Sequence, residues 1–292
     1  MENENNITGA NANRKYKDSV FTRLFGEKDK LAELYNAING TSYTPDDITV
    51  TTLRNVLFMG QINDIAFILR DKLIVLIEHQ SSINPNMPLR FLLYIVRIYQ
   101  ELIENDALYG SRLVKIMPPE FIVMYNGTDD YPNEAALKLS DAFIRKEAVN
   151  LELTAKVYNV NNGRNREIMN RSETLNGYAV FVARARANIE NGLELSAALE
   201  KAVKDCVRDE ILEEFLTKYG SDVINMLNLE WNLDDALRVR EKDGALNKAE
   251  KIAEKMLKRG TPIEIVVEDT ELSIERVKEI AKKIQSANPA MA

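Results

Sequence analysis

The sequence predicts an α/β (α+β) fold in which a mixed β-sheet is flanked by helices and followed by a mostly helical C-terminal region. Three observations support this prediction. Runs of β-branched and aromatic residues alternate with helical periodicity in the first half of the chain. One helix separates two apolar strands, which requires a crossover and therefore a parallel pair. After Gly163 the pattern is almost wholly helical.

Composition limits the class of protein. The chain has 292 residues, 45% hydrophobic and 28% charged, a globular composition with room for one large core or two smaller ones. The net charge of −7 argues against coating nucleic acid by bulk electrostatics, although a local basic patch or bound divalent cations would still permit DNA binding. The single cysteine, Cys206, excludes an internal disulfide and fits a reducing compartment.

Targeting and membrane segments are not evident in the sequence. The first 18 residues are polar, unlike a secretory signal. The longest apolar run, residues 91–99, is broken by Arg97 and is far shorter than the ~20 residues that cross a bilayer. We therefore expect a soluble, cytoplasmic protein without a membrane partner.

The first elements follow from local patterns. Residues 27–40 predict a helix, because apolar residues recur at helical spacing until Gly40 ends it. Residues 48–60 are rich in β-branched and aromatic residues and predict a strand. Two apolar runs within residues 63–82 predict a β-hairpin.

A helix and two further strands complete the predicted sheet. Residues 84–106 predict a helix, with a proline near its start and an apolar stripe through Leu92, Ile95 and Tyr99. Residues 119–128 and 151–163 predict strands that end at Asn-Gly turns. The helix between strands three and four makes the sheet mixed, with helices on both faces.

The hairpin brings two carboxylates together. If the chain turns with Asp71 at its centre, paired positions sum to 142, and Asp64 lies directly opposite Glu78. Opposed Cβ atoms are about 5 Å apart, where like charges repel unless a cation neutralises them. Gln80 shares this face because strand side chains alternate, whereas His79 points the other way and offers only its carbonyl.

Two interpretations of this acidic pair remain. Acidic residues at strand ends commonly reach water and carry no chemistry. However, both faces of the hairpin are apolar, which predicts a central, buried position where an unpaired acidic pair is costly. The sequence therefore favours a metal site at Asp64 and Glu78 over the solvated alternative.

These motifs resemble a known family. The chain from Tyr16 to Met169 is similar to the Rpn family of recombination-promoting nucleases, also described as PD-(D/E)XK family transposases. The most specific shared feature is Glu-x-Gln, Glu78 to Gln80, followed by Asn-Pro-x-Met-Pro-x-Arg. Further similar segments are "YKDSVFTRLFG", "FIVMYNG" and "VYNVNNGRNREIM".

The resemblance implies a DNA endonuclease with a restriction-endonuclease-like core, in which a metal ion assists phosphodiester hydrolysis. Asp64, Glu78 and Gln80 would be catalytic, and Asp64, Glu78 and the His79 carbonyl would bind Mg²⁺, with Mn²⁺ or Ca²⁺ as alternatives. Gln80 occupies the position of the lysine of the wider superfamily, so it offers an amide but no positive charge. The alternative function is a catalytically weak member that binds DNA or protein through its helical C-terminal half.

Other polar residues near the motif have two interpretations each. Arg90, Tyr94 and Arg97 recur along one face of the helix after the motif, where they would contact the DNA backbone or simply snorkel at the edge of the core. Asp18 is either a third acidic group or the N-cap of a short helix, and the cap is favoured.

The chain is expected to divide into four parts: a disordered tail, the nuclease core, a helical extension, and a charged helix with a helix-turn-helix-like tail, over residues 1–14, 15–180, 181–243 and 244–286. Helix breaks are predicted at residues 190–192 and 219–221, and the charged helix is either continuous or interrupted at Gly244.

The tail is expected to hold two short helices. Thr261, with Glu264 three residues later, predicts the cap of the first, and Ser273 begins the second. The basic residues of the second helix would suit DNA, but the acidic residues of its neighbour favour packing or homo-oligomerisation.

Overall fold

In the computed structural model of the chain, the structure describes residues 20–50, 64–70, 73–145 and 149–287. The chain forms two compact units, residues 1–230 and 231–292. The helices between residues 181 and 230 therefore belong to the same unit as the sheet. The four-part division expected from the sequence stays a prediction.

The first unit contains a six-stranded mixed sheet, which confirms the predicted fold class. β3, β4 and β6 run parallel in its centre, and the outer pairs are antiparallel. The order is β1-β2-β3-β4-β6-β5, for β1 (Ile48–Val50), β2 (Asp64–Leu69), β3 (Leu73–Gln80), β4 (Pro119–Tyr125), β5 (Glu134–Lys138) and β6 (Thr154–Asn159).

Two strands differ from expectation. The strand predicted over 48–60 is present as β1, and residues 51–63 lie outside the described residues. β5 was not predicted, because its sequence Glu-Ala-Ala-Leu-Lys consists of good helix formers. It is a strand because it pairs with β6 along its whole length at the edge of the sheet.

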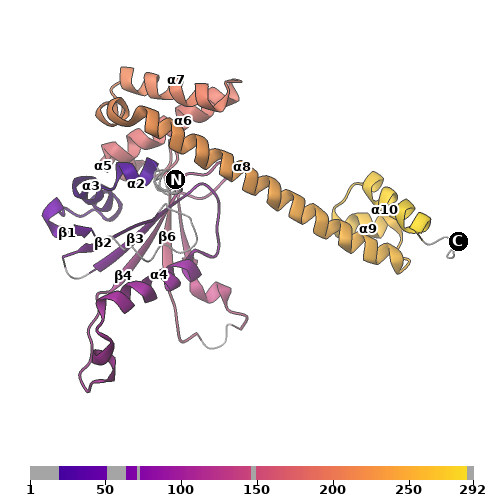
Figure 1. Cartoon of the computed structure of the whole chain (residues 1–292), viewed down its shortest axis with the longest axis horizontal. Helices are drawn as coiled ribbons and strands as arrows, with labels where there is room; N and C mark the ends of the chain where they lie inside the picture. Colours follow the sequence, from indigo (N-terminus) through magenta and orange to yellow (C-terminus); the bar gives the residue numbers. More distant parts are fainter. Residues whose placement is uncertain (1–19, 51–63, 71–72, 146–148, 288–292) are drawn as a thin grey trace, which may run out of the picture. The chain divides into compact units, whose positions relative to one another are not determined.

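Helices cover both faces of the sheet, as Figure 1 shows, with α4 on one side and α2, α3 and α6 on the other. The helices of this unit are α2 (Val20–Leu24), α3 (Lys28–Asn39), α4 (Met87–Leu102), α5 (Arg166–Arg171), α6 (Glu173–Glu190), α7 (Leu195–Arg208) and the first part of α8 (Glu213–Lys258). Short 3₁₀ turns are η1 (Pro45–Asp47), η2 (Asn105–Tyr109) and η3 (Leu139–Ala142). Gly40 ends α3 in the left-handed conformation, as predicted.

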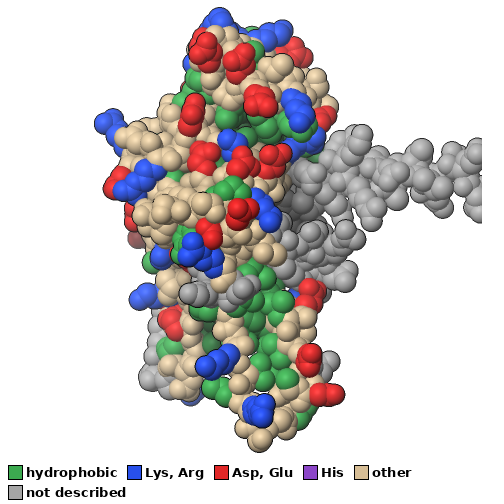
Figure 2. Space-filling view, turned by 90° about the vertical axis from the view of Figure 1, so that its left-hand side faces the viewer, with side chains coloured by type: hydrophobic (Ala, Val, Ile, Leu, Met, Phe, Trp, Pro, Cys, Tyr) green, Lys and Arg blue, Asp and Glu red, His purple; other side chains and the backbone are tan. Residues whose placement is uncertain are grey.

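α4 is the crossover between β3 and β4, and it packs on one face of the sheet. Its inward residues, Met87, Phe91, Tyr94, Ile95 and Ile98, form a core with Phe121, Val123 and Tyr125 of β4. Its outward side is also apolar, as Figure 2 shows at the level of α4, and exposes Leu89, Leu93 and Val96. The inward residues therefore fix the start of α4 close to the end of β3.

The opposite face is covered by aromatic contacts. The Phe21 ring of α2 stacks on His79 of β3, with centroids 4.7 Å apart. The Tyr35 ring of α3 meets Phe67 of β2 edge-on at 6.2 Å. Because Phe21 and Phe67 are fully buried, these contacts hold α2 and α3 on the sheet.

Glu33 joins α3 to the start of α6. Its carboxylate accepts hydrogen bonds from the Ser172 hydroxyl at 2.6 Å, the Thr174 amide at 2.9 Å and the Thr174 hydroxyl at 2.8 Å, and Lys30 lies 3.6 Å away. Burial would raise the pKa of Glu33, but these hydrogen bonds and the Lys30 charge outweigh it and lower the pKa. The negative charge also suits the amino end of α6.

Replacing Glu33 with glutamine is expected to cost about 2 kcal/mol of stability at neutral pH, because it removes a charged acceptor from two hydroxyls. A carboxyl group with a lowered pKa stabilises the fold above its ordinary pKa in the unfolded chain, and this contribution disappears as pH falls through the pKa of the folded state. Urea unfolding of both proteins between about pH 7 and pH 3 measures it. The stability gap should close at low pH, and a gap independent of pH would contradict this assignment.

The helix breaks agree with expectation in part. α6 ends at Glu190 and α7 begins at Leu195, as predicted. The break predicted at 219–221 is wrong, since α8 continues through it. A Cβ on Gly220 would lie 3.2 Å from the Val203 side chain, so this glycine allows α8 to approach α7 rather than ending a helix. The break lies instead at residues 209–212, and α8 is also continuous at Gly244.

The second unit consists of the end of α8 with α9 (Ile263–Thr270) and α10 (Ile274–Ala287) around a small core. The Thr261 cap is wrong, because Pro262 occupies the N-cap position and no side chain caps α9. Ser273 does begin the second helix, and its hydroxyl accepts the Arg276 amide at 3.3 Å. Arg276 pairs with Glu250 and Glu279, so its charge is largely neutralised within the unit.

In the described ranges, no helix has the length and apolarity that spanning a bilayer requires.

Candidate functional site

The candidate site lies where the parallel strands end. The backbone N–H of Asn126 donates to the backbone carbonyl of Gln80 at 2.9 Å. The backbone N–H of Val160 donates to the backbone carbonyl of Tyr125 at 2.7 Å. These bonds bring the carboxyl ends of β3, β4 and β6 to one edge of the sheet. Ligands of open α/β sheets bind at such edges.

Asp64 and Glu78 occupy paired positions at this edge. The hairpin register places Asp64 directly opposite Glu78 and Leu69 opposite Leu73, which confirms the predicted sum of 142. Glu78 also pairs with Val123 of β4, so its position is flanked by strands on both sides. The side chains of Asp64 and Glu78 lie outside the described part of the structure. Their joint role in metal binding therefore stays a prediction.

Gln80 and two of the predicted α4 residues meet around Met87. The Gln80 amide nitrogen lies 2.7 Å from the Met87 sulfur, and the Arg90 guanidinium lies 3.6 Å from the same sulfur. Arg90 also donates to the Tyr94 hydroxyl at 3.0 Å. Arg97 lies two turns further along α4 and is half-exposed. The structure thus collects Gln80, Arg90 and Tyr94 at the start of α4.

His79 faces the other side of the sheet, as predicted from strand alternation. Its ring is buried, stacked on Phe21, and its Nε2 lies 3.0 Å from the Tyr178 hydroxyl. Burial, together with the Arg186 charge, lowers the pKa of His79 to about 3. The ring is therefore neutral near pH 7, and the sequence alone gave no sign of its partner.

Asparagine side chains close the same edge. Asn159 donates to the Tyr131 carbonyl at 2.8 Å and accepts from Asn161 at 2.9 Å. Asn161 also donates to the Gly127 carbonyl at 2.9 Å and accepts from Arg186 at 2.9 Å. These bonds fix the turns after β4 and β6.

Comparison with protein families gives the decisive observation. The model of the family described as "Putative transposase, YhgA-like" matches residues 53–210, more than half of the chain. The chain belongs to this family. The YhgA-like transposases are a PD-(D/E)XK-type family, and the matched region includes the hairpin, the α4 crossover and α6. Searches of curated proteins and of solved structures found no match.

The donor types at the edge fit a hard divalent cation such as the one predicted from the sequence. Asp64, Glu78 and the His79 carbonyl are all oxygen donors, which suit hard cations such as Mg²⁺. Among the residues with described side chains, no group of three His, Cys, Asp or Glu could hold a metal ion. The side chains of Asp64 and Glu78 lie outside that set, so a metal site at these paired positions stays a prediction.

Proposed function

We propose that this YhgA-like family member is a divalent-metal-dependent DNA endonuclease that acts in recombination or in a mobile element. The observation that carries the proposal is the direct pairing of Asp64 with Glu78 at the carboxyl edge of the sheet, two residues before Gln80. Two carboxylates at opposed positions need a counter-charge, and a divalent cation supplies it. The family description supports DNA as the substrate class.

In this proposal Asp64 and Glu78 would hold Mg²⁺, with the His79 carbonyl as a further oxygen ligand. When bound, the metal would polarise the scissile phosphate and acidify a water molecule. Gln80 would orient the attacking water, because an amide offers both a donor and an acceptor.

Arg90 would supply the positive charge that Gln80 lacks. The side chains of Gln80 and Arg90 both contact the Met87 sulfur, so only this atom separates the guanidinium from the amide. A guanidinium can bind a phosphate oxygen through two parallel hydrogen bonds. Tyr94 holds Arg90 from the next turn of α4.

Incubation of the full chain with supercoiled plasmid tests the proposal. Nicked product should accumulate with Mg²⁺ or Mn²⁺ at catalytic protein concentrations and should be absent with EDTA. A Gln80→Ala variant should nick about 100-fold more slowly, the size of loss expected when a reacting molecule is no longer correctly positioned. Nicking that persists in EDTA would contradict the proposal.

A second function is favoured by one observation, the amide at Gln80 in place of a lysine. In that case the protein would bind DNA or a partner protein without turnover. Stoichiometric DNA binding in Mg²⁺ without any nicked product would support this alternative over the endonuclease.

A further inference from the structure

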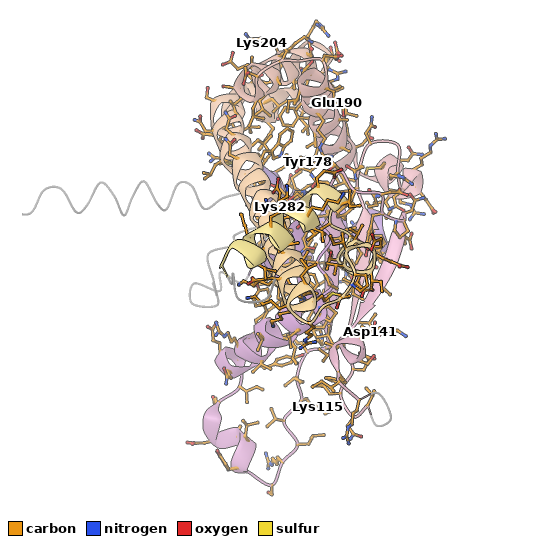
Figure 3. The ribbon with its side chains drawn as sticks, turned by 90° about the vertical axis from the view of Figure 1, so that its right-hand side faces the viewer. Lys115, Asp141, Tyr178, Glu190, Lys204 and Lys282 are labelled. Atoms are coloured by element: carbon orange, nitrogen blue, oxygen red, sulfur yellow. The ribbon has the colours of Figure 1, made fainter. Side chains whose placement is uncertain are left out.

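A buried network of three hydrogen-bonded side chains, those of His79, Tyr178 and Asn126, lies directly behind the candidate site. Tyr178, labelled in Figure 3, comes from α6 and is 1% exposed. Its hydroxyl lies 3.0 Å from His79 Nε2 and accepts a hydrogen bond from Asn126 Nδ2 at 3.2 Å. The network therefore joins β3, α6 and the residue that follows β4.

The direction of these hydrogen bonds defines the state of the histidine. Since Asn126 donates to the Tyr178 hydroxyl, the hydroxyl proton is available for His79 Nε2. If Nε2 accepts this proton it carries none of its own, and the neutral ring is then protonated at Nδ1. The Arg186 guanidinium binds the backbone carbonyl of Asn126 and therefore lies beside these hydrogen-bonded side chains.

The backbone of Asn126 closes this network into a ring. The backbone carbonyl of Asn126 accepts a hydrogen bond from Arg186, and its backbone N–H donates to the Gln80 carbonyl. His79, held by Tyr178, immediately precedes Gln80 in β3. Both ends of the network, His79 and Asn126, therefore contact the last residues of β3, where Glu78 and Gln80 are located.

Packing alone does not account for this arrangement. In the part of the chain that the structure describes, His79 Nδ1 and Asn126 Oδ1 are buried without hydrogen-bond partners. Such atoms are rare and costly in native proteins, and an apolar side chain would fill the same space without them. A buried polar network with this cost, directly behind the proposed ligands, is best explained by what it positions.

We propose that Tyr178 is a positioning residue that, through His79 and Asn126, sets the end of β3 so that Glu78, the His79 carbonyl and Gln80 are aligned for metal binding. This inference rests on the proposed endonuclease function. Outer partners of metal ligands act in this way, and their loss typically costs 10–100-fold in affinity or activity.

The wild-type protein offers a test that requires no mutation. His79 is the only histidine, so ¹⁵N-histidine labelling gives one pair of ring nitrogen signals. We expect a neutral ring with a proton on Nδ1 and none on Nε2, and a shift of these signals when Mg²⁺ is added. A ring protonated on Nε2 instead, or ring signals that do not shift at saturating Mg²⁺, would overturn the proposal.

A matched pair of variants separates positioning from stability. Tyr178→Phe removes the hydroxyl at the centre of the network. Tyr35→Phe removes a hydroxyl that donates to Glu120, near the opposite end of β4, at 2.8 Å. We expect Mn²⁺ affinity to fall about 10-fold in Tyr178→Phe, with nicking restored by excess Mg²⁺, and to stay unchanged in Tyr35→Phe.

The two proposals fail in different ways. Equal metal affinity in Tyr178→Phe and Tyr35→Phe, with a wild type that binds metal and nicks DNA, would overturn the positioning role alone. A wild type that neither binds Mn²⁺ nor nicks DNA would overturn the endonuclease and the positioning role together.

Discussion

Asp64→Asn and Glu78→Gln are each expected to abolish Mg²⁺-dependent nicking of supercoiled DNA while leaving the protein folded. Each substitution removes one charged oxygen ligand from the paired positions of the hairpin. The remaining carboxylate would hold a divalent cation only weakly. In the metal-free protein, loss of one of two opposed like charges relieves repulsion, so thermal stability should be equal or slightly higher.

Glu120→Gln is the matched control for these variants. Glu120 lies near the start of β4, where it contacts Tyr35 and Lys156, away from the carboxyl edge. It should nick like the wild type. Mg²⁺ should raise the melting temperature of the wild type and of Glu120→Gln, because a ligand of the folded state stabilises it, but not that of the two site variants. Full activity in either site variant would refute the assigned ligands.

Gly127→Ala is expected to destabilise the protein by about 3 kcal/mol, the upper part of the usual range for overpacking. Gly127 follows Asn126 at the end of β4, and a Cβ there would overlap the Ser81 carbonyl oxygen and the Tyr125 hydroxyl. Backbone would have to move, which separates the end of β4 from Ser81 and disturbs the candidate site. Urea unfolding measures the loss of stability, and nicking in Mg²⁺ measures the effect on the site.

Gly110→Ala is the control for this substitution. Gly110 has a φ of −76°, which any residue adopts, and a Cβ there would meet nothing closer than 3.4 Å. Its stability and activity should match the wild type. Equal unfolding midpoints for the two glycine variants would show that the contact between Gly127 and Ser81 is unimportant.

The sequence predicts the central geometry well because the determinants are local. A turn assumed at the centre of the hairpin sequence, together with the two-residue period of strands, is sufficient to predict that Asp64 pairs with Glu78, and the register confirms this pair. The apolar stripe of α4 and the crossover between β3 and β4 likewise follow from spacing within one segment.

Other features depend on contacts between distant segments. β5 contains helix-forming residues and is a strand only because β6 pairs with it. Gly220 suggests a helix break but serves the approach of α8 to α7. Tyr178 lies 99 residues from its partner His79, so no local pattern could reveal that hydrogen bond.

A crystal structure of the wild type soaked with Mn²⁺, with anomalous scattering used to locate the metal, tests the account most directly. We expect one Mn²⁺ ion bound by carboxylate oxygens of both Asp64 and Glu78, at about 2.0–2.2 Å, close to the distances typical of Mg²⁺ sites. A metal bound elsewhere, or saturating Mn²⁺ without an anomalous peak between these two residues, would contradict it.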